Sequence, residues 1–102
     1  MKGFNGNIEE LTVQNDNFRQ VLYTAKHCQL VLMSLPVGGE IGSEIHEEND
    51  QFFRFEAGQG KVLIDDNEYA VSDGSAIIVP AGAEHNVINT GEEPLKLYTI
   101  YS

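Results

Sequence analysis

The sequence predicts an all-β fold, an antiparallel sandwich or barrel built from about eight or nine short strands. Apolar runs alternate with turn residues along most of the chain, for example residues 29–35 followed by the break at 36–39. Short strands separated by regularly spaced turn signals are typical of antiparallel sandwiches and barrels. No segment keeps an apolar period of 3.6 residues for more than two helical turns, which excludes a mainly helical fold.

The expected strands follow one another to the end of the chain. They cover residues 18–23, 29–35, 43–46, 52–56, 61–64, 68–71, 76–79, 85–88 and 95–101. The polar triplet Asp65-Asp66-Asn67 separates two of them and predicts a hairpin turn. Residues 8–13 suit either one turn of helix or an edge strand, and the sequence alone leaves both open.

Length, charge and cysteine content narrow the class of protein. The chain has 102 residues, so we expect residues 1–102 to form one domain. Six basic residues against sixteen acidic ones give a net charge of −10, which argues against a nucleic-acid or anionic-membrane partner. Cys28 is the only cysteine, which excludes an internal disulfide and a cysteine-based zinc site. The start of the chain lacks the apolar core of a signal peptide, so we expect a cytoplasmic protein.

Four side chains form a candidate metal site. Glu44 and His46 are two residues apart, so on a strand they face the same way. A strand that returns antiparallel beside them could bring Gln51 across from both, and a closed sheet could add His85. Two imidazoles, a carboxylate and an amide oxygen suit one divalent transition metal (Mn, Fe, Ni, Co or Zn), and the sequence does not decide which. Gln51 is either a ligand or a hydrogen-bonding group beside the ligands.

Alternation along the strands also predicts the wall of a pocket. Phe53 and Phe55 share the parity of Gln51, and Val87 shares the parity of His85. These three apolar residues should therefore line a pocket around the metal. A polar ion within an apolar and aromatic wall suits a small, partly hydrophobic organic substrate.

Two motifs in this chain resemble those of the cupins. The first cupin motif, G-x5-HxH-x3,4-E-x6-G, is similar to residues 38–58, where Gly38, Glu44-Ile45-His46, Gln51 and Gly58 hold its fixed positions. The second, G-x5-PxG-x2-H-x3-N, is matched throughout by residues 74–89, with Gly74, Pro80, Gly82, His85 and Asn89.

The resemblance implies a small single-domain cupin, an antiparallel double-stranded β-helix or jelly-roll barrel that is usually a homodimer through sheet faces. Tyr98 and Tyr101 are candidates for that face. Glu44 stands where the family pattern has its first histidine, and Gln51 stands where it has its glutamate. The carboxylate ligand of the family pattern is thus found at the position of the first histidine rather than at its usual position, and the chain still has four potential ligands.

The expected function follows from the charge of the site. One carboxylate around a 2+ ion leaves a formal +1, which attracts an anionic oxygen and stabilises developing negative charge. We therefore expect Lewis-acid chemistry, an isomerisation or ring opening, on a small carbonyl, sugar or sugar-acid compound. The alternatives are a metal-dependent dioxygenase and a non-catalytic small-ligand binding module. A mannose-6-phosphate isomerase-like activity would need a basic residue to hold the phosphate, and the candidates are Arg19, Arg54, Lys2, Lys26, Lys61 and Lys96. By parity Arg54 points away from the site, which argues against this activity. The sequence identifies no catalytic residue.

Overall fold

The computed structural model describes residues 1–102 and contains one short helix and nine strands. In chain order the elements are α1 (Ile8–Gln14), β1 (Arg19–Thr24), β2 (Gln29–Leu35), β3 (Glu44–Ile45), β4 (Gln51–Ala57), β5 (Gln59–Ile64), β6 (Asn67–Ser72), β7 (Ala76–Val79), β8 (Glu84–Asn89) and β9 (Leu95–Tyr101). Every expected strand is present, and the all-β prediction is confirmed.

The segment that the sequence left open is a helix. Asn7 caps α1, because its side-chain oxygen accepts a hydrogen bond from the Glu10 amide at 3.1 Å. Glu9 and Glu10 lie in the first turn, where negative charge stabilises a helix N-terminus. With seven residues, α1 is too short to show a clear helical period in the sequence. No helix in the structure is long and apolar enough to cross a membrane.

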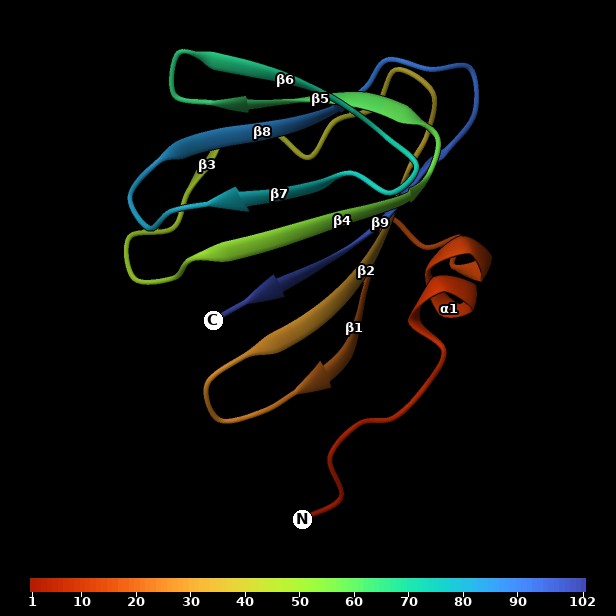
Figure 1. The fold of residues 1–102 in the computed structure, drawn as a ribbon, viewed down its shortest axis with the longest axis vertical. Helices are drawn as coiled ribbons and strands as arrows, with labels where there is room; N and C mark the ends of the chain where they lie inside the picture. Colours follow the sequence, from red (N-terminus) through yellow and green to blue (C-terminus); the bar gives the residue numbers. More distant parts are fainter.

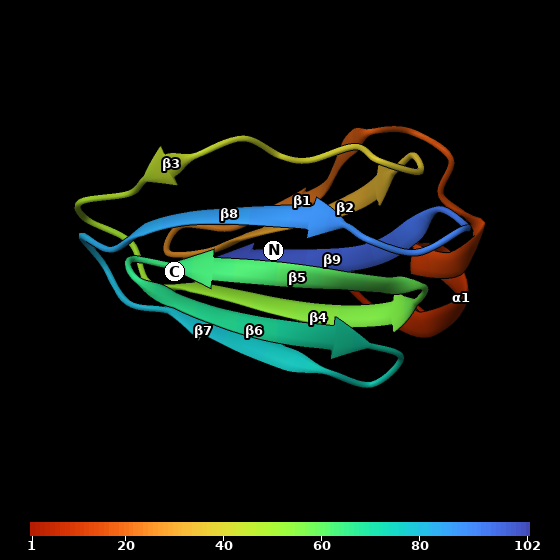
Figure 2. The same ribbon diagram turned by 90° about the horizontal axis from the view of Figure 1, so that it is seen from above.

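Two antiparallel sheets face each other. The larger has the strand order β1-β2-β9-β4-β7, and the smaller has the order β3-β8-β5-β6. Figure 1 shows the two layers of strands, with α1 beside the larger sheet. Viewed from above, α1 lies at the end of the strands opposite β3 (Figure 2). β3, which begins at Glu44, is therefore at the end of the barrel away from α1.

The core lies between the sheets. Twelve buried apolar residues form it, and both sheets contribute: Val31, Met33, Leu35, Phe53, Phe55, Val62, Val71, Val79, Ala83, Val87, Leu95 and Leu97. In β4 the buried residues alternate with half-buried ones, as expected for a strand with one face on the core. The expected inward direction of Gln51, Phe53 and Phe55 is therefore confirmed.

The outer face of the larger sheet carries the other half of β4. The Arg54 guanidinium (Nη2) lies 3.5 Å from the Glu56 carboxylate (Oε1), so Arg54 points away from the barrel interior as its parity predicts. Tyr98 in β9 lies opposite Arg54. Burial raises the pKa of Tyr98 above the ordinary value of 10.0, although the positive charge of Arg54 opposes that shift.

Gly60 in β5 gives the first prediction, because the backbone of β8 and the side chain of Leu95 approach it closely. A Cβ at Gly60 would lie 2.6 Å from the Ile88 carbonyl oxygen and 2.7 Å from Leu95 Cδ2. We expect Gly60→Ala to lower the free energy of unfolding by about 1–3 kcal/mol, since overpacking forces neighbouring groups to move. Urea denaturation measures the loss. Gln59→Ala, at the exposed neighbouring residue, is the control, and an equal effect of both variants would contradict the prediction.

Candidate metal centre

Glu44 and His46 lie at the open end of the barrel, on either side of Ile45. Glu44 begins β3, where it pairs with His85 of β8, and His46 directly follows the strand. Glu44 Oε2 is 3.3 Å from His46 Nε2. This approach lacks hydrogen-bond geometry, because His46 Nε2 is buried without any hydrogen-bond partner. The side chains are 40% and 27% exposed, so both can be reached from solvent.

Gln51 reaches the same region from the other sheet. The strand pairing that could have brought Gln51 across from Glu44 and His46 is absent, since β3 pairs with β8 whereas β4 lies between β9 and β7. Gln51 faces the smaller sheet across the barrel interior and is 3% exposed. Its amide nitrogen donates to the Thr99 hydroxyl at 2.9 Å, which fixes the orientation of the amide. The amide oxygen is buried and has no hydrogen-bond partner.

His85 packs behind His46. It is 3% exposed, and the two ring centroids are 5.4 Å apart. His85 Nδ1 lies 3.3 Å from the Ala83 carbonyl oxygen. When Nδ1 donates its proton to that carbonyl, the second ring nitrogen keeps its lone pair, as in many metal-binding histidines. The structure thus brings all four predicted donors to one end of the barrel.

Aromatic rings surround the two histidines. Tyr101 meets the His46 ring edge-on at 5.3 Å, and Phe53 meets the His85 ring in the same way at 6.0 Å. Tyr101 therefore points into the barrel. The sequence left its parity open, and this direction removes it from the candidates for an outer, subunit-pairing face. Tyr98 is on the opposite face of β9, where its ring lies 6.2 Å from that of Phe52.

A cavity of about 500 Å³ opens in front of these groups. It is lined by Phe18, Arg19, Gln29, Met33, Ile41, Glu44, His46, Asn49, Gln51, Phe53 and Tyr101. Of the three residues expected in its wall, Phe53 lines it. Phe55 and Val87 do not, because they point inward at deeper levels of the barrel and are fully buried in the core. The volume is within the usual range for small-molecule sites.

One pair of the predicted donors, Glu44 and His46, has the spacing that a divalent ion requires. No group of three or more His, Cys, Asp or Glu side chains in the structure is arranged to hold a metal ion. Glu44, His46 and His85 therefore do not form a metal site by themselves; of the four predicted donors, Glu44, His46 and Gln51 line the cavity and His85 does not. Two ligand atoms that each bind a metal at about 2.1 Å lie roughly 3.0–3.4 Å apart in octahedral or tetrahedral geometry. The 3.3 Å between Glu44 Oε2 and His46 Nε2 agrees with that spacing.

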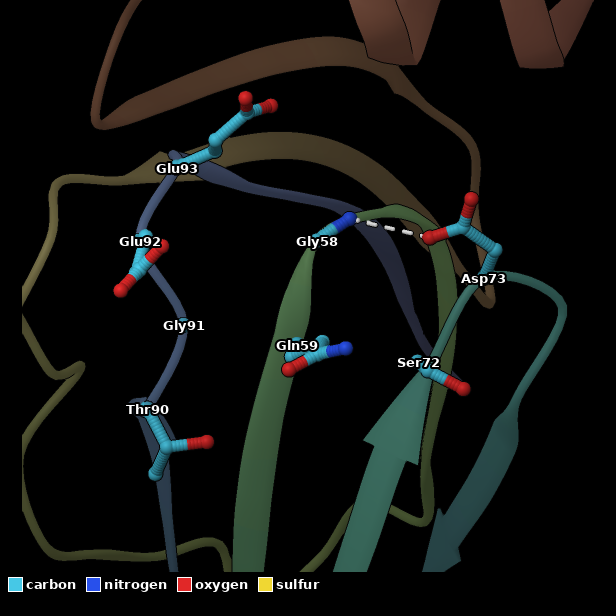
Figure 3. Close-up of a pocket in the computed structure, with 8 residues that line it drawn as sticks. All are labelled: Gly58, Gln59, Ser72, Asp73, Thr90, Gly91, Glu92 and Glu93. Atoms are coloured by element: carbon cyan, nitrogen blue, oxygen red, sulfur yellow. Dashed lines mark hydrogen bonds between the residues drawn. The ribbon is translucent and has the colours of Figure 1, made fainter.

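A larger cavity, of about 650 Å³, lies at the other end of the strands. Figure 3 shows the residues that line it, which come from the loops after β4, β6 and β8 and from the adjoining ends of β5 and β6. It contains no histidine and no hydrophobic residue, and its charged side chains are Asp73, Glu92 and Glu93. Asp73 is already engaged, because its carboxylate accepts a hydrogen bond from the Gly58 amide at 3.0 Å. The smaller cavity, which is lined by three of the four predicted donors (Glu44, His46 and Gln51), is the better candidate for a functional site.

Sequence reasoning did not place several residues of the site. Thr99 orients the Gln51 amide, and Tyr101 covers His46. Both belong to β9, whose inward positions are otherwise Leu95 and Leu97. A polar residue at an inward position among leucines indicates a functional role for Thr99. This indication can be used only once the register of β9, and therefore the inward direction of Thr99, is known.

Two facing antiparallel sheets with converging donor side chains at one end define a double-stranded β-helix with an internal candidate site. The cupin domain family matches residues 31–101, so the chain belongs to the cupins. The predicted family and fold are confirmed.

Comparisons with known proteins agree with this assignment. The chain is 51% identical to the uncharacterized protein YrkC of Bacillus subtilis, over 99% of this chain and 58% of YrkC. The crystal structure of BH2720 from Bacillus halodurans superposes with a TM-score of 0.96 at 47% identity, over 98% of this chain and 80% of that one. A weaker similarity, 28% identity over 64% of this chain, covers 14% of the mannose-1-phosphate guanylyltransferase of Klebsiella pneumoniae. The chain thus spans a little over half of the length of its Bacillus subtilis relative.

Proposed function

We propose that this cupin binds one divalent transition metal through Glu44, His46, Gln51 and His85 and acts on a small carbonyl, sugar or sugar-acid compound. One observation carries the proposal: His46 Nε2 and Gln51 Oε1 are buried, lack hydrogen-bond partners and belong to the wall of one cavity. Buried polar atoms without partners are rare in native proteins, and an ion is one of the few groups that satisfies them.

The side chains have distinct parts in this proposal. Glu44 supplies the only negative charge among the four donors, so that the site with a 2+ ion keeps a formal +1. Thr99 and the Ala83 carbonyl hold Gln51 and His85 in orientations that leave an acceptor atom available. When bound, the metal supplies a Lewis acid that stabilises negative charge developing on a substrate oxygen. Phe53 and Tyr101 form the nearby apolar wall, which limits access of water to that oxygen.

Elemental analysis and product detection test the proposal. We expect purified protein to retain a stoichiometric transition metal after dialysis and to convert a sugar acid or hydroxy-keto compound without consuming oxygen. Oxygen uptake with a diketone would instead support a dioxygenase. Saturable binding without a product, measured by mass spectrometry, would support a binding module. Conversion that continues unchanged in the metal-free protein would contradict all metal-dependent activities.

A second prediction concerns the neutral donor. Gln51→Glu should tighten metal binding by about tenfold, because a second carboxylate adds negative charge to the ligand set. The same variant should bind anionic ligands more weakly, since the formal charge of the loaded site falls from +1 to zero. Titration with Mn²⁺ or Ni²⁺ measures the first effect. Gln59→Glu, which makes the same change at the opposite end of the strands, is the control, and equal metal affinities of both variants would remove Gln51 from the ligand set.

We also propose a homodimer, formed through the outer face of the larger sheet. An apolar row crosses four strands on that face, where Leu30, Ile100, Phe52 and Ile78 are successive partners. Ile78 is 66% exposed in the single chain. A partner subunit over this row would bury it, which is favourable for apolar surface.

Sedimentation of a charged variant tests the dimer. We expect wild-type protein to sediment as a dimer and Ile78→Lys as a monomer, because an unpaired lysine in an apolar interface is costly to desolvate. Val37→Lys introduces the same side chain at another exposed position, in the loop after β2, and should remain dimeric. A wild-type monomer at micromolar concentration would refute this part of the proposal.

A further inference from the structure

The cavity contains a cation that the proposed metal site does not use. Arg19, the first residue of β1, is the only Lys or Arg among the lining residues. The ion pairs of the structure involve His46, Arg54, Lys61 and Lys96, and none involves Arg19. In a chain with sixteen acidic residues, this guanidinium faces a cavity whose only carboxylate, Glu44, lies against His46.

Neighbouring polar groups orient Arg19. Its Nη2 donates to the Gln29 side-chain oxygen at 3.5 Å, which is a long hydrogen bond. The Gln29 amide nitrogen in turn donates to the Thr24 hydroxyl at 3.0 Å, so the glutamine presents its oxygen rather than its nitrogen to the guanidinium. This short chain of hydrogen bonds engages one Nη of Arg19 and leaves the other N–H donors available to a ligand.

The register of the larger sheet relates Arg19 to the proposed metal site. Gln29, Tyr101 and Gln51 are successive partners across β2, β9 and β4, and all three line the cavity. Neighbouring strands are about 4.8 Å apart, which puts the backbones of Gln29 and Gln51 about 10 Å from each other. The Arg19 guanidinium, beside Gln29, is therefore at the other end of a row that begins at a proposed metal ligand.

We propose that Arg19 is the anion-binding residue of this site, and that the ligand is an acid whose carboxylate or phosphate lies several bonds from the oxygen that meets the metal. The inference rests on the proposed metal site and narrows its substrate class. A planar guanidinium binds carboxylate and phosphate through paired hydrogen bonds. Neutral sugars and diketones have no group for this position, so they bind less well than acids of similar size.

A matched pair of ligands tests the proposal by calorimetry on nickel-loaded protein. 2-Oxoglutarate and 2-oxopentanoate share the 2-oxo acid group and the five-carbon chain, and only the former has a distal carboxylate. We expect wild-type protein to bind 2-oxoglutarate at least tenfold more tightly than 2-oxopentanoate. Arg19→Gln should abolish that difference and leave nickel affinity unchanged. Lys61→Gln removes one positive charge from the smaller sheet and should keep the difference.

Further arms separate the possible outcomes. A preference for 2-oxoglutarate that survives Arg19→Gln, or a wild-type protein without any preference, overturns the inference while nickel binding still supports the metal site. Protein that binds no nickel contradicts the proposed function, and the comparison is then made on metal-free protein with glutarate and pentanoate. There, an Arg19-dependent preference for glutarate supports the anion site, and equal binding overturns it. If inorganic phosphate competes with the dicarboxylate for this position, phosphate is identified as the preferred group. If inorganic phosphate does not compete, carboxylate is identified instead.

Discussion

His46→Ala is expected to weaken the binding of a divalent transition metal by about 100-fold or more, because even groups that only support metal ligands contribute 10- to 100-fold to affinity. His46 offers a buried ring nitrogen without a hydrogen-bond partner, 3.3 Å from the Glu44 carboxylate. Its side chain is partly exposed, so the replacement should not disturb the core. Titration of metal-free protein with Mn²⁺, Ni²⁺ and Zn²⁺ measures the affinity, and circular dichroism checks that the variant is folded.

His27→Ala is the matched control for this prediction. His27 is an exposed histidine between β1 and β2 and does not line the cavity. Its removal should leave metal affinity unchanged, whereas Glu44→Ala should weaken binding as His46→Ala does. Undiminished binding in both His46→Ala and Glu44→Ala would show that any metal is held elsewhere.

Phe55→Ala is expected to destabilise the fold by about 3–5 kcal/mol, the usual cost of removing a large buried ring and leaving a cavity. Phe55 is fully buried in the centre of the core, and its ring stacks on Phe53 with centroids 6.4 Å apart. A loss of this size is a large share of the stability of an ordinary domain. Chemical denaturation at a fixed protein concentration measures it.

Two further variants make this stability test decisive. Phe55→Leu keeps most of the apolar volume, so we expect a smaller loss, and this variant serves if Phe55→Ala does not fold. Val37→Ala shortens an exposed apolar side chain outside the core and should change stability by about 0.5 kcal/mol or less. A loss at Phe55 no larger than at Val37 would contradict the central position of Phe55.

The strands could be predicted from the sequence because each apolar run is bounded by residues that favour turns. The hairpin at Asp65-Asp66-Asn67 is an example: β5 ends at Ile64, β6 begins at Asn67, and Asp65 adopts a φ of +50° between them. Aspartate tolerates this left-handed conformation better than most residues. The alternation of inward and outward residues also predicted which side of β4 faces the core. The turn signals and this alternation both depend only on residues that are close in the sequence.

Long-range placement could not be predicted in the same way. Alternation gives the direction of Phe55 and Val87 but not their depth, and both lie below the cavity rather than in its wall. Gln51 follows β3 after a short loop, yet that loop crosses to the other sheet instead of turning back. The parity of Tyr101 depends on the register of β9, which pairs with strands distant in the sequence.

The cavity has walls from two sheets that touch mainly through the core. Glu44 and His46 lie at β3 of the smaller sheet, whereas Arg19, Gln29 and Gln51 belong to the larger one. Any molecule or ion gripped from both sides joins the two layers, so pulling them apart requires its release. Occupancy and resistance to heat are then coupled, and a compound present at 100 times its Kd would add about 2.7 kcal/mol to the unfolding free energy. Thermal shift measurements can therefore find a natural ligand before any reaction is known.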